Sequence, residues 1–512
     1  MVLIKRVPSP CPGVFEASKL PVRAVHDQTQ IFDLLPRSYS MLIRQTLTYL
    51  PGAAAAPLFA FLTLIVFSRI LTPEQYGRFA LVIVTVELFK GGFFLWIKIS
   101  LLRLFTAACE ENALPDLLRT GYIALAVSGI AASIAYLATV YSGVFDTEYR
   151  FALLLGLPLL IAKAGAEQQL VLRSADTRPG VHSLMQIIQG STGFFSAIVL
   201  VQFVVMDERG LLLGTLLGFT TIWLGDMANW RRRARDGILR PAILTNMASF
   251  GLPLSIATLL TFVVSFSDRY MLEYFMGPEA VGLYSVGYNL ADRSIVSLFM
   301  LVSLAGLPLT LKVLEIDGID AAKVQLRSNF NLIIALGCPA VVGIAMLAQP
   351  IANVFLGEDY RQAATSIMPL IAVSAFLAGF KTFYLDHAFH LGKRSGLLFL
   401  SALPPAIINV LANIIFIPIY GIHGAVYATI LAYVIAALLS LFLGRRIFTL
   451  PISFPTFLKS AFASAVMAAA LAAITMPDNG FGLLMAVACG SIVFAAMAFA
   501  VDLGGVRRKI FQ

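Results

Sequence analysis

Five basic side chains lie inside long apolar stretches of this sequence: Lys90, Lys163, Arg269, Arg293 and Lys381. A charge at the centre of a bilayer costs about 2.5–3.5 kcal/mol on insertion scales, so such residues should face a cavity or a partner rather than lipid. Ammonium and guanidinium groups can replace the water that a phosphate loses on leaving solution. We therefore predict that these bases bind a phosphate-bearing head group as it crosses the bilayer.

Four acidic residues accompany the bases and give them a second interpretation: Glu87, Asp268, Asp292 and Asp386. Glu87 and Lys90 are three positions apart, so they share a helix face and can neutralise each other. Adjacent residues diverge by about 100° around a helix, so Asp268 is not expected to satisfy Arg269 fully. The charges therefore either line a water-filled cleft, where Glu87 or Asp292 could couple transport to an ion gradient, or pair and hold helices together.

The elements that position these charges are apolar helices. Hydrophobic residues make up 59% of the 512 residues and charged residues 13%, against about 25% charged in a typical soluble protein. Apolar stretches of about 20 residues recur along the chain, which predicts an all-α polytopic membrane protein with about 14 transmembrane helices. The predicted spans are 47–68, 79–99, 119–142, 151–171, 184–206, 210–229, 250–273, 285–311, 328–348, 363–388, 396–417, 422–443, 457–476 and 480–501.

Basic residues are distributed unevenly between the two sides that these spans define. With the amino terminus in the cytoplasm, most of the 37 Lys and Arg residues fall in inward tails and loops. The outward loops hold only Arg69, Arg78, Arg150, Arg209 and Arg361. This pattern predicts that both termini lie inside. It also accounts for the net charge of +9 without a nucleic-acid partner.

A short polar segment occurs twice. Leu71–Phe79 (LTPEQYGRF) is echoed 205 positions later by Met276–Tyr284 (MGPEAVGLY). The same offset carries Glu87 onto Asp292, so two repeated helices place a carboxylate at the same depth. Matched halves of this kind are typical of transporters. We expect the two segments to be paired gate corners at the outer mouth of a cleft, with these hinge residues: Pro73, Glu74, Gly77, Pro278, Glu279 and Gly282.

The repeat predicts two pseudo-symmetric six-helix lobes related by an axis along the membrane normal. Residues 1–40 would be a disordered cytoplasmic tail, with Met41 as an alternative start. The predicted divisions after it are a lobe at 41–230, a basic cytoplasmic linker at 231–249, a second lobe at 250–444, and two extra helices with a basic tail at 445–512.

Motifs for other chemistry are weak. The sequence has no nucleotide-binding glycine pattern and no zinc-protease pattern, so we expect no cofactor and no ATP hydrolysis within the chain. His387 and His390 are three apart but lack a third ligand, and the four cysteines have no metal-ligand spacing, so no metal site is expected. The basic run Arg231–Arg235 is expected to contact anionic lipid head groups.

Several motifs resemble Wzx-type lipid-linked oligosaccharide flippases, in the polysaccharide branch of the multidrug/oligosaccharidyl-lipid/polysaccharide exporter superfamily. The resemblance covers residues 41–450 and rests on these segments: Leu42-Ile-Arg-Gln, Ser68–Gly77 (SRILTPEQYG), Phe250–Leu254 (FGLPL), Ser267–Leu272 (SDRYML), Gly277–Ser285 (GPEAVGLYS), Phe355–Arg361 (FLGEDYR) and Ile417–Ala425 (IPIYGIHGA).

The resemblance implies a bacterial inner-membrane protein that carries an undecaprenyl-diphosphate-linked glycan to the periplasmic leaflet by alternating access. It implies membrane lipids and glycan polymerase machinery as partners. Asp268 and Arg269 match the family's Asp-Arg pair, and Arg103 matches its basic residue after the second span. Pro73, Glu74, Gly77 and Gly282 match its hinge.

Two alternatives belong to other functional classes. A multidrug cation antiporter of the same superfamily would need a cleft dominated by acids and aromatics, and the five bases argue against it. A membrane enzyme that polymerises or ligates glycans usually presents a large outward loop with catalytic side chains. The predicted outward loops are only about 4–14 residues long, too short to hold such a site.

Overall fold

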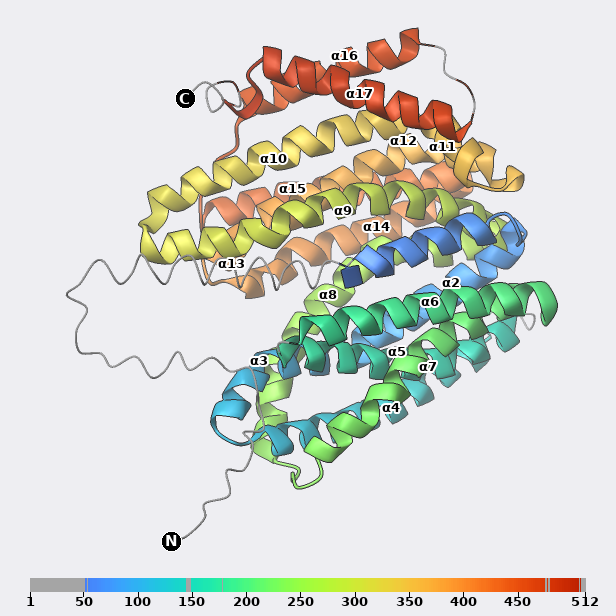
Figure 1. The fold of residues 1–512 in the computed structure, drawn as a ribbon, viewed down its shortest axis with the longest axis vertical. Coiled ribbons are helices and arrows are strands. Elements are labelled where there is room, and N and C mark those ends of the chain that lie inside the picture. Colours follow the sequence, from blue (N-terminus) through green and yellow to red (C-terminus); the bar gives the residue numbers. More distant parts are fainter. Residues whose placement is uncertain are drawn as a thin grey trace. The chain divides into compact units, whose positions relative to one another are not determined.

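The fold is described by a computed structural model covering residues 51–507, except residues 53, 144–148, 177, 475, 476, 478 and 506. Within these residues the chain is helical and has no strand (Figure 1). It divides into two compact units. The amino-terminal unit holds the residues up to Thr63 and Val82–Ser255, and the carboxy-terminal unit holds Leu64–Leu81 and the residues from Ile256 onward.

The amino-terminal unit is a helical bundle. It contains the second part of α2 (Pro73–Phe93), then α3 (Leu95–Glu110), α4 (Leu114–Tyr141), α5 (Tyr149–Ala175), α6 (Pro179–Phe203), α7 (Glu208–Arg233) and the first part of α8 (Pro241–Met276). Helices α2 and α3 meet at a 50° bend. Proline begins α2, α6 and α8, where its missing N–H is not needed. A core cluster around Leu101, Phe105 and Trp230 joins α3, α4, α5 and α7.

The carboxy-terminal unit is also built of helices. After the rest of α8 come α9 (Pro278–Ile316), α10 (Gly318–Met346), α11 (Ala348–Phe355), α12 (Glu358–Phe380), a π-helical turn (Lys381–Leu385), α13 (His387–Leu391), α14 (Leu398–Tyr420), α15 (Ile422–Arg445), α16 (Phe454–Ala473) and α17 (Gly480–Ala500). Its core includes Phe299, Phe330 and Tyr384. Helices α16 and α17 pack on each other and lie beside α10 (Figure 1).

The prediction of an all-α polytopic membrane protein is confirmed. Twelve helices of the described chain are long and apolar enough to cross a membrane, or 13 if the bent pair α2–α3 is one span. A shorter apolar helix, Ala54–Phe67, precedes them. The count of about 14 spans and the inward placement of both termini stay predictions. The predicted tail at 1–40 lies outside the described residues.

Two predicted loops are mostly helix. The segment 312–327 lies almost entirely within α9 and α10, which are joined at Asp317 and Gly318. Gly318 has φ of 84°, which lets the chain turn sharply there. In the segment 231–249, α7 continues to Arg233 and α8 begins at Pro241. Hydropathy falls at the predicted ends of these helices. A helix can nevertheless continue beyond the apolar layer, because its backbone hydrogen bonds do not depend on apolar side chains.

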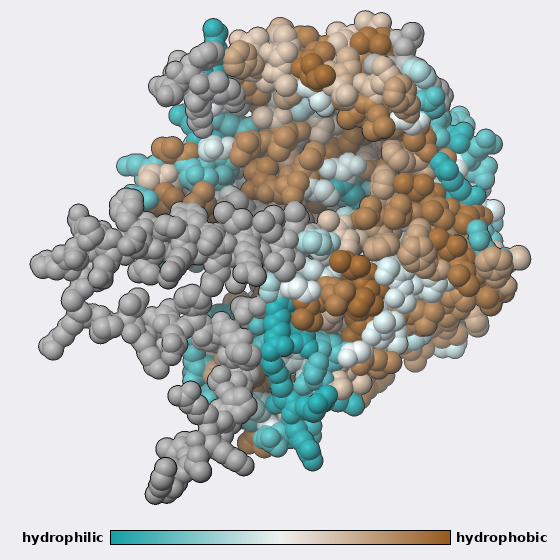
Figure 2. Space-filling view, in the orientation of Figure 1, coloured by the Kyte–Doolittle hydropathy of each residue, from teal (hydrophilic) through white to brown (hydrophobic). Residues whose placement is uncertain are grey.

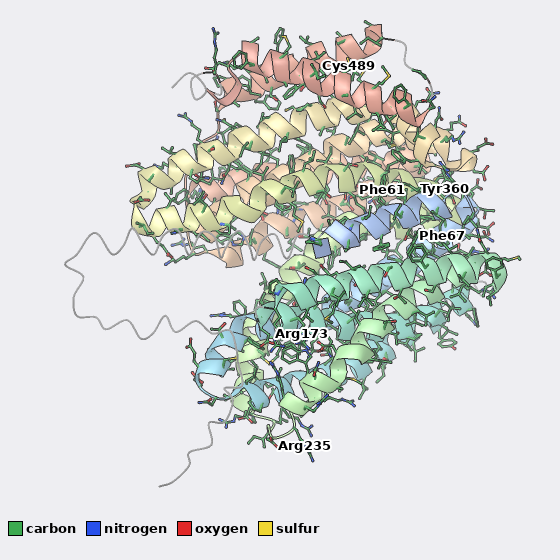
Figure 3. All side chains as sticks on the ribbon, in the orientation of Figure 1. Phe61, Phe67, Arg173, Arg235, Tyr360 and Cys489 are labelled. Atoms are coloured by element: carbon green, nitrogen blue, oxygen red, sulfur yellow. The ribbon has the colours of Figure 1, made fainter. Side chains whose placement is uncertain are left out.

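The surface agrees with a lipid environment. Large hydrophobic side chains are exposed along α16 and α17, including Phe462, Leu484 and Ile492, and Figure 2 shows hydrophobic residues over these helices. Charged residues with a structural role are instead inside a bundle. Arg173 is 5% exposed and lies among the helices of the amino-terminal unit, whereas Arg235 lies at the edge of that unit (Figure 3).

Candidate functional site

The charges of the amino-terminal unit form one network across helices. The Lys90 ammonium on α2 lies 2.6 Å from a carboxylate oxygen of Glu87 and 2.6 Å from one of Glu167 on α5. Lys163 on α5 donates a hydrogen bond to Glu87. The predicted Glu87–Lys90 pair is therefore present, but it is part of a larger cluster that ties α2 to α5. These side chains are 15–21% exposed, so they are largely withdrawn from solvent.

Sequence reasoning missed Lys98 as a member of this network. Its ammonium lies 3.1 Å from the second carboxylate oxygen of Glu167. Lys98 lies at the end of the predicted span 79–99, but in the structure it belongs to α3, just beyond the bend at Phe94. Lys98 follows Lys90 by eight positions, a little over two helical turns, so the two lysines point toward a similar face. This spacing is the sequence feature that could have identified Lys98 as a member of the network.

Asp268 and Arg269 of α8 form a buried pair in the carboxy-terminal unit. Asp268 is fully buried and Arg269 is 2% exposed. The guanidinium Nη1 donates to Asp268 Oδ1 at 2.9 Å and to the Ser265 carbonyl oxygen at 2.8 Å. Although adjacent side chains diverge around a helix, the long arginine side chain bends back and reaches the carboxylate. The other carboxylate oxygen accepts a hydrogen bond from the Tyr284 hydroxyl.

Aromatic rings surround the buried guanidinium. Its central carbon lies 5.3 Å from the ring centre of Phe266, 5.4 Å from that of Tyr284 and 4.6 Å from that of Tyr288. Cation–π attraction is strongest where the cation has lost its water, as here. Tyr284 had been noted only as the aromatic residue of the repeated segment. Its role follows from burial, because a buried tyrosine hydroxyl needs a partner.

Asp292 and Arg293 lie on α9, in the middle of an apolar helix. Asp292 is 14 positions after Pro278, just as Glu87 is 14 positions after Pro73, and each proline is the first residue of its helix. Each carboxylate is therefore about 21 Å from the first residue of its helix, and the equal depth of the two in the membrane stays a prediction. Arg293 is exposed, and no carboxylate among the described residues lies within 4.0 Å of its guanidinium.

Lys381 and Asp386 form an ion pair, as expected if the intramembrane charges pair and hold helices together. The Lys381 ammonium donates to Asp386 Oδ2 at 2.7 Å, and Ser440 donates to Asp386 Oδ1 at 2.8 Å. Both charged residues are less than 10% exposed. The π-helical turn Lys381–Leu385 brings together two residues five positions apart, which an α-helix would place on different faces. This pair holds the end of α12 against α15.

The two repeated hinges pack directly against each other within the carboxy-terminal unit. A Cβ atom on Gly77 would collide with the carbonyl oxygen of Pro278, and one on Gly282 would collide with the carbonyl oxygen of Pro73. The contacts are reciprocal, so the first turns of α2 and α9 cross at the two glycines. Glu74 and Glu279 lie in the first turns of these helices, where a carboxylate is favourable. The gate role of these residues stays a proposal.

Arg103 and Phe250, from two separate motifs of the family resemblance, meet in the amino-terminal unit. The guanidinium carbon of Arg103 on α3 lies 3.8 Å from the ring centre of Phe250 on α8. Deeper in the same unit, Arg173 of α5 binds Asp226 of α7, with Nε 2.8 Å from Oδ2. The sequence placed Arg173 in a loop, but it is a buried residue that joins two helices.

The structure therefore places the five predicted bases in distinct settings. Lys90 and Lys163 share one network in the amino-terminal unit, while Arg269 and Lys381 each have a carboxylate partner in the carboxy-terminal unit. Arg293 has none among the described residues. The five bases could line one cleft only if residues of both units faced it, and this arrangement stays a prediction.

Comparison with known proteins gives one family and one fold. Residues 66–365 match the family described as polysaccharide biosynthesis protein. A search of curated protein sequences gives no significant match.

Among solved structures, the lipid II flippase MurJ in an inward closed conformation is similar over 91% of this chain and 99% of its own, with a TM-score of 0.73 and 14% identity. An inward-facing multidrug resistance MATE transporter is similar over 78% and 97%, with a TM-score of 0.61 and 14% identity. A MOP superfamily transporter from Pyrococcus furiosus is similar over 79% and 94%, with a TM-score of 0.58 and 15% identity. The chain thus has the MOP transporter fold.

Proposed function

We propose a function from the premise that this chain belongs to the polysaccharide biosynthesis protein family: it is a flippase that moves a lipid-linked oligosaccharide across the bacterial inner membrane. The family and the fold are those of transporters rather than of enzymes. In this proposal the cargo is a glycan on undecaprenyl diphosphate, and it passes from the cytoplasmic to the periplasmic leaflet for surface or exopolysaccharide synthesis. Membrane lipids and the glycan polymerase machinery would be its partners.

Arg293 is the observation that best supports an anionic cargo. It lies on α9, whose most apolar window has a mean hydropathy of 2.1. An unpaired guanidinium in such a helix costs free energy unless a cavity or an anion compensates it. The four other intramembrane bases already have carboxylate partners, so Arg293 is the one among them that is available to a phosphate. A cationic drug would gain nothing from this residue.

The crossing of the two hinges suggests how the cargo path is closed. We place the crossing at the periplasmic end, because the outward loops include both turns in the predicted topology. The crossing needs glycine on both sides, since each glycine faces a carbonyl oxygen of the other hinge. In an alternating-access cycle this contact would form when the path is closed to the periplasm and separate when the glycan is released.

One substitution tests the gate. Gly77→Val should prevent the close approach of α2 and α9 and reduce transport at least tenfold, because the added side chain would displace the Pro278 carbonyl. Gly92 lies on the same helix with open space around its Cβ position, so Gly92→Ala is the matched control and should transport normally. Normal transport by Gly77→Val would remove the gate role from the hinge.

Deletion of the gene tests the function as a whole. Cells without the protein should lose surface glycan and accumulate the lipid-linked precursor on the cytoplasmic face. Wild-type protein and the Arg361→Gln variant should restore export, because Arg361 is a half-buried residue at the start of α12 that lies near Glu358 and is not among the intramembrane bases. Arg293→Gln should insert normally but fail to restore export. A precursor that still reaches the periplasmic face in the deletion strain would disprove the flippase.

A further inference from the structure

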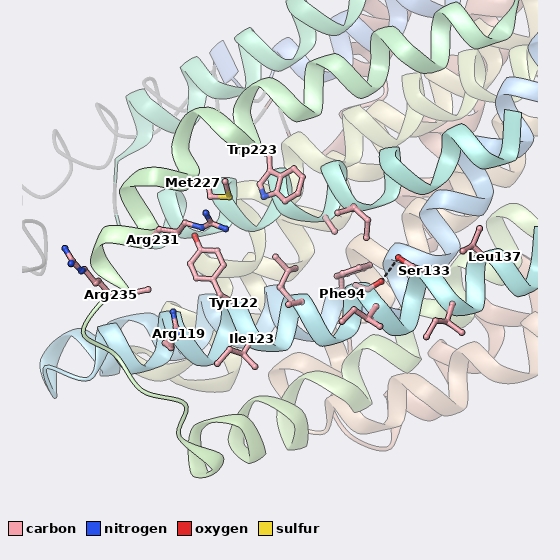
Figure 4. A pocket seen from close by; sticks show the side chains of 18 residues that line it. Phe94, Arg119, Tyr122, Ile123, Ser133, Leu137, Trp223, Met227, Arg231 and Arg235 are labelled. Carbon is pink, nitrogen blue, oxygen red and sulfur yellow. Dashed lines mark hydrogen bonds between the residues drawn. The ribbon is translucent and has the colours of Figure 1, made fainter. Parts of the chain in front are cut away.

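A long groove runs along the amino-terminal unit between α4, α5 and α7 (Figure 4). Its cavity volume is about 830 Å³. All of its lining residues belong to this one unit, and none is among the intramembrane charges described above. The groove therefore is a second candidate site with its own chemistry.

The greater part of the groove is apolar and long. Its apolar wall on α4 extends from Ile123 to Leu137 and includes Ile130 and Ile134. Fourteen residues of α-helix rise about 21 Å, against roughly 30 Å for a bilayer's hydrocarbon core. A fatty acyl chain of an ordinary phospholipid occupies one leaflet, about half of that length. The groove thus fits an apolar chain that extends beyond one leaflet.

One end of the groove is basic. Arg119 at the start of α4, Arg231 at the end of α7 and Arg235 in the turn after it line this end, with Tyr122 between them (Figure 4). It is the end that the charge distribution predicts to face the cytoplasm. Guanidinium groups bind phosphate oxygens in pairs of hydrogen bonds, and basic pockets between transmembrane helices bind anionic head groups.

These three arginines differ from several basic neighbours in having no acidic partner among the described residues. Among the described residues, no carboxylate lies within 4.0 Å of any of the three. Other arginines at the same end are paired: Arg178 Nε lies 3.1 Å from Asp176, Arg233 Nη1 lies 3.2 Å from Asp176, and Arg240 Nε lies 2.6 Å from Asp116. Three cations at this end thus line the groove without a carboxylate partner among the described residues, so its mouth is positively charged.

We propose that this groove binds a lipid with a diphosphate head group and a chain longer than one leaflet, with the diphosphate on Arg119, Arg231 and Arg235. The inference rests on the proposed function, since such a lipid would be the carrier end of the cargo held before translocation. Two features favour it over a membrane phospholipid. The head group of a phospholipid has a single phosphate for three arginines, and its chains would leave about a third of the apolar wall uncovered.

Binding of undecaprenyl diphosphate to the purified full chain tests the proposal. Trp223 lines the groove, so its fluorescence should change on binding and the change should vanish in Trp223→Phe. Removing charge-assisted hydrogen bonds with Arg231→Gln plus Arg235→Gln should weaken binding about tenfold or more. Arg232→Gln is the matched control, because Arg232 is an exposed neighbour on α7 that does not line the groove.

The apolar wall has its own matched variants. Gly129 lines the groove, and a Cβ there would lie 3.7 Å from Ile161 Cδ1, an ordinary contact. Gly129→Leu should therefore obstruct the chain and weaken binding, while Gly225→Leu should bind normally, because Gly225 on α7 does not line the groove and has open space around its Cβ position. Undecaprenol and inorganic diphosphate, which each carry half of the probe, should bind at least tenfold more weakly than undecaprenyl diphosphate.

Three results would overturn the proposal: equal binding of phosphatidylglycerol, equal binding of undecaprenol, or unchanged affinity in the double arginine variant. If these occur while Arg293→Gln still abolishes export, the groove assignment fails and the proposed function stands. If the groove binds undecaprenyl diphosphate but the protein never moves a lipid-linked oligosaccharide in liposomes, the proposed function fails and the groove assignment stands.

Discussion

Glu87 in the amino-terminal unit and Asp292 in the carboxy-terminal unit stand at the same position on repeated helices, but their surroundings differ. Glu87 is enclosed by two lysines from α2 and α5. Asp292 is followed by Arg293, which is exposed and lacks a carboxylate partner among the described residues. A buried ion pair of the carboxy-terminal unit, Asp268–Arg269, lies instead on α8, the preceding helix.

The difference separates charges that hold helices from charges that can bind cargo. In the amino-terminal network Lys90, Lys98 and Lys163 share two carboxylates, so most of the positive charge is already compensated. In the carboxy-terminal unit Arg269 is buried among aromatic rings, whereas Arg293 is exposed. We therefore expect stability to depend most on Asp268 and Arg269, less on the lysine network, and least on Arg293.

Asp268→Ala should have the largest effect on stability. It would leave the Arg269 guanidinium buried without its counter-charge, at a cost of about 3–5 kcal/mol. Thermal unfolding of the purified protein in detergent measures this, and a variant that does not fold at all also fits. Replacing both residues, Asp268→Leu with Arg269→Met, should recover most of the stability, since no charge is stranded. If the single and double variants unfold alike, the pair is not the stabilising element that we describe.

Lys163→Met should have an intermediate effect. Glu87 keeps Lys90 as a partner, so the expected loss is about 1–2 kcal/mol, the cost of one charge-assisted hydrogen bond. A double-mutant cycle with Glu87→Gln measures the coupling between the two residues directly. A stable Lys163→Met protein that no longer transports would contradict the comparison, because it would make the amino-terminal network part of the cargo site.

Arg293→Gln should have the smallest effect on stability, within about 0.5 kcal/mol, because the side chain is exposed and has no carboxylate partner in the described part of the chain. The same variant is expected to lose transport, which separates binding from folding at one position. Arg361→Gln should also be stable but should transport normally. A large loss of stability in Arg293→Gln would show that this arginine has a structural partner in the folded protein.

The helical membrane fold was predictable because hydropathy and helix-starting prolines are local properties of the chain. Proline begins α2 and α9 where the repeat placed the hinges. The predicted ends of the spans were less accurate where helices extend past their apolar part, as at α9 and α10. Arg173 was misplaced for the same reason, since its partner Asp226 is 53 positions away and hydropathy carries no information about such pairs.

The site was predictable as a set of residues but not as a set of contacts. Sequence spacing found Glu87 with Lys90, yet it could not show that Lys163 and Lys98 join them from other helices. The Lys381–Asp386 pair depends on a π-helical turn, which periodicity arguments that assume 3.6 residues per turn do not anticipate. The sequence also gave no reason to connect Arg119 with Arg231, because the groove that they share exists only after folding.

The reciprocal contact of Gly77 and Gly282 has the form of an isologous interface, in which each copy offers the surface that it receives. Such a contact does not require that the two copies be covalently joined. A protein of half this length, carrying one hinge, would present both the glycine and the proline carbonyl that the contact needs. Each hinge therefore supplies what the other receives, so a side chain added at Gly282 should disturb the same contact as one added at Gly77.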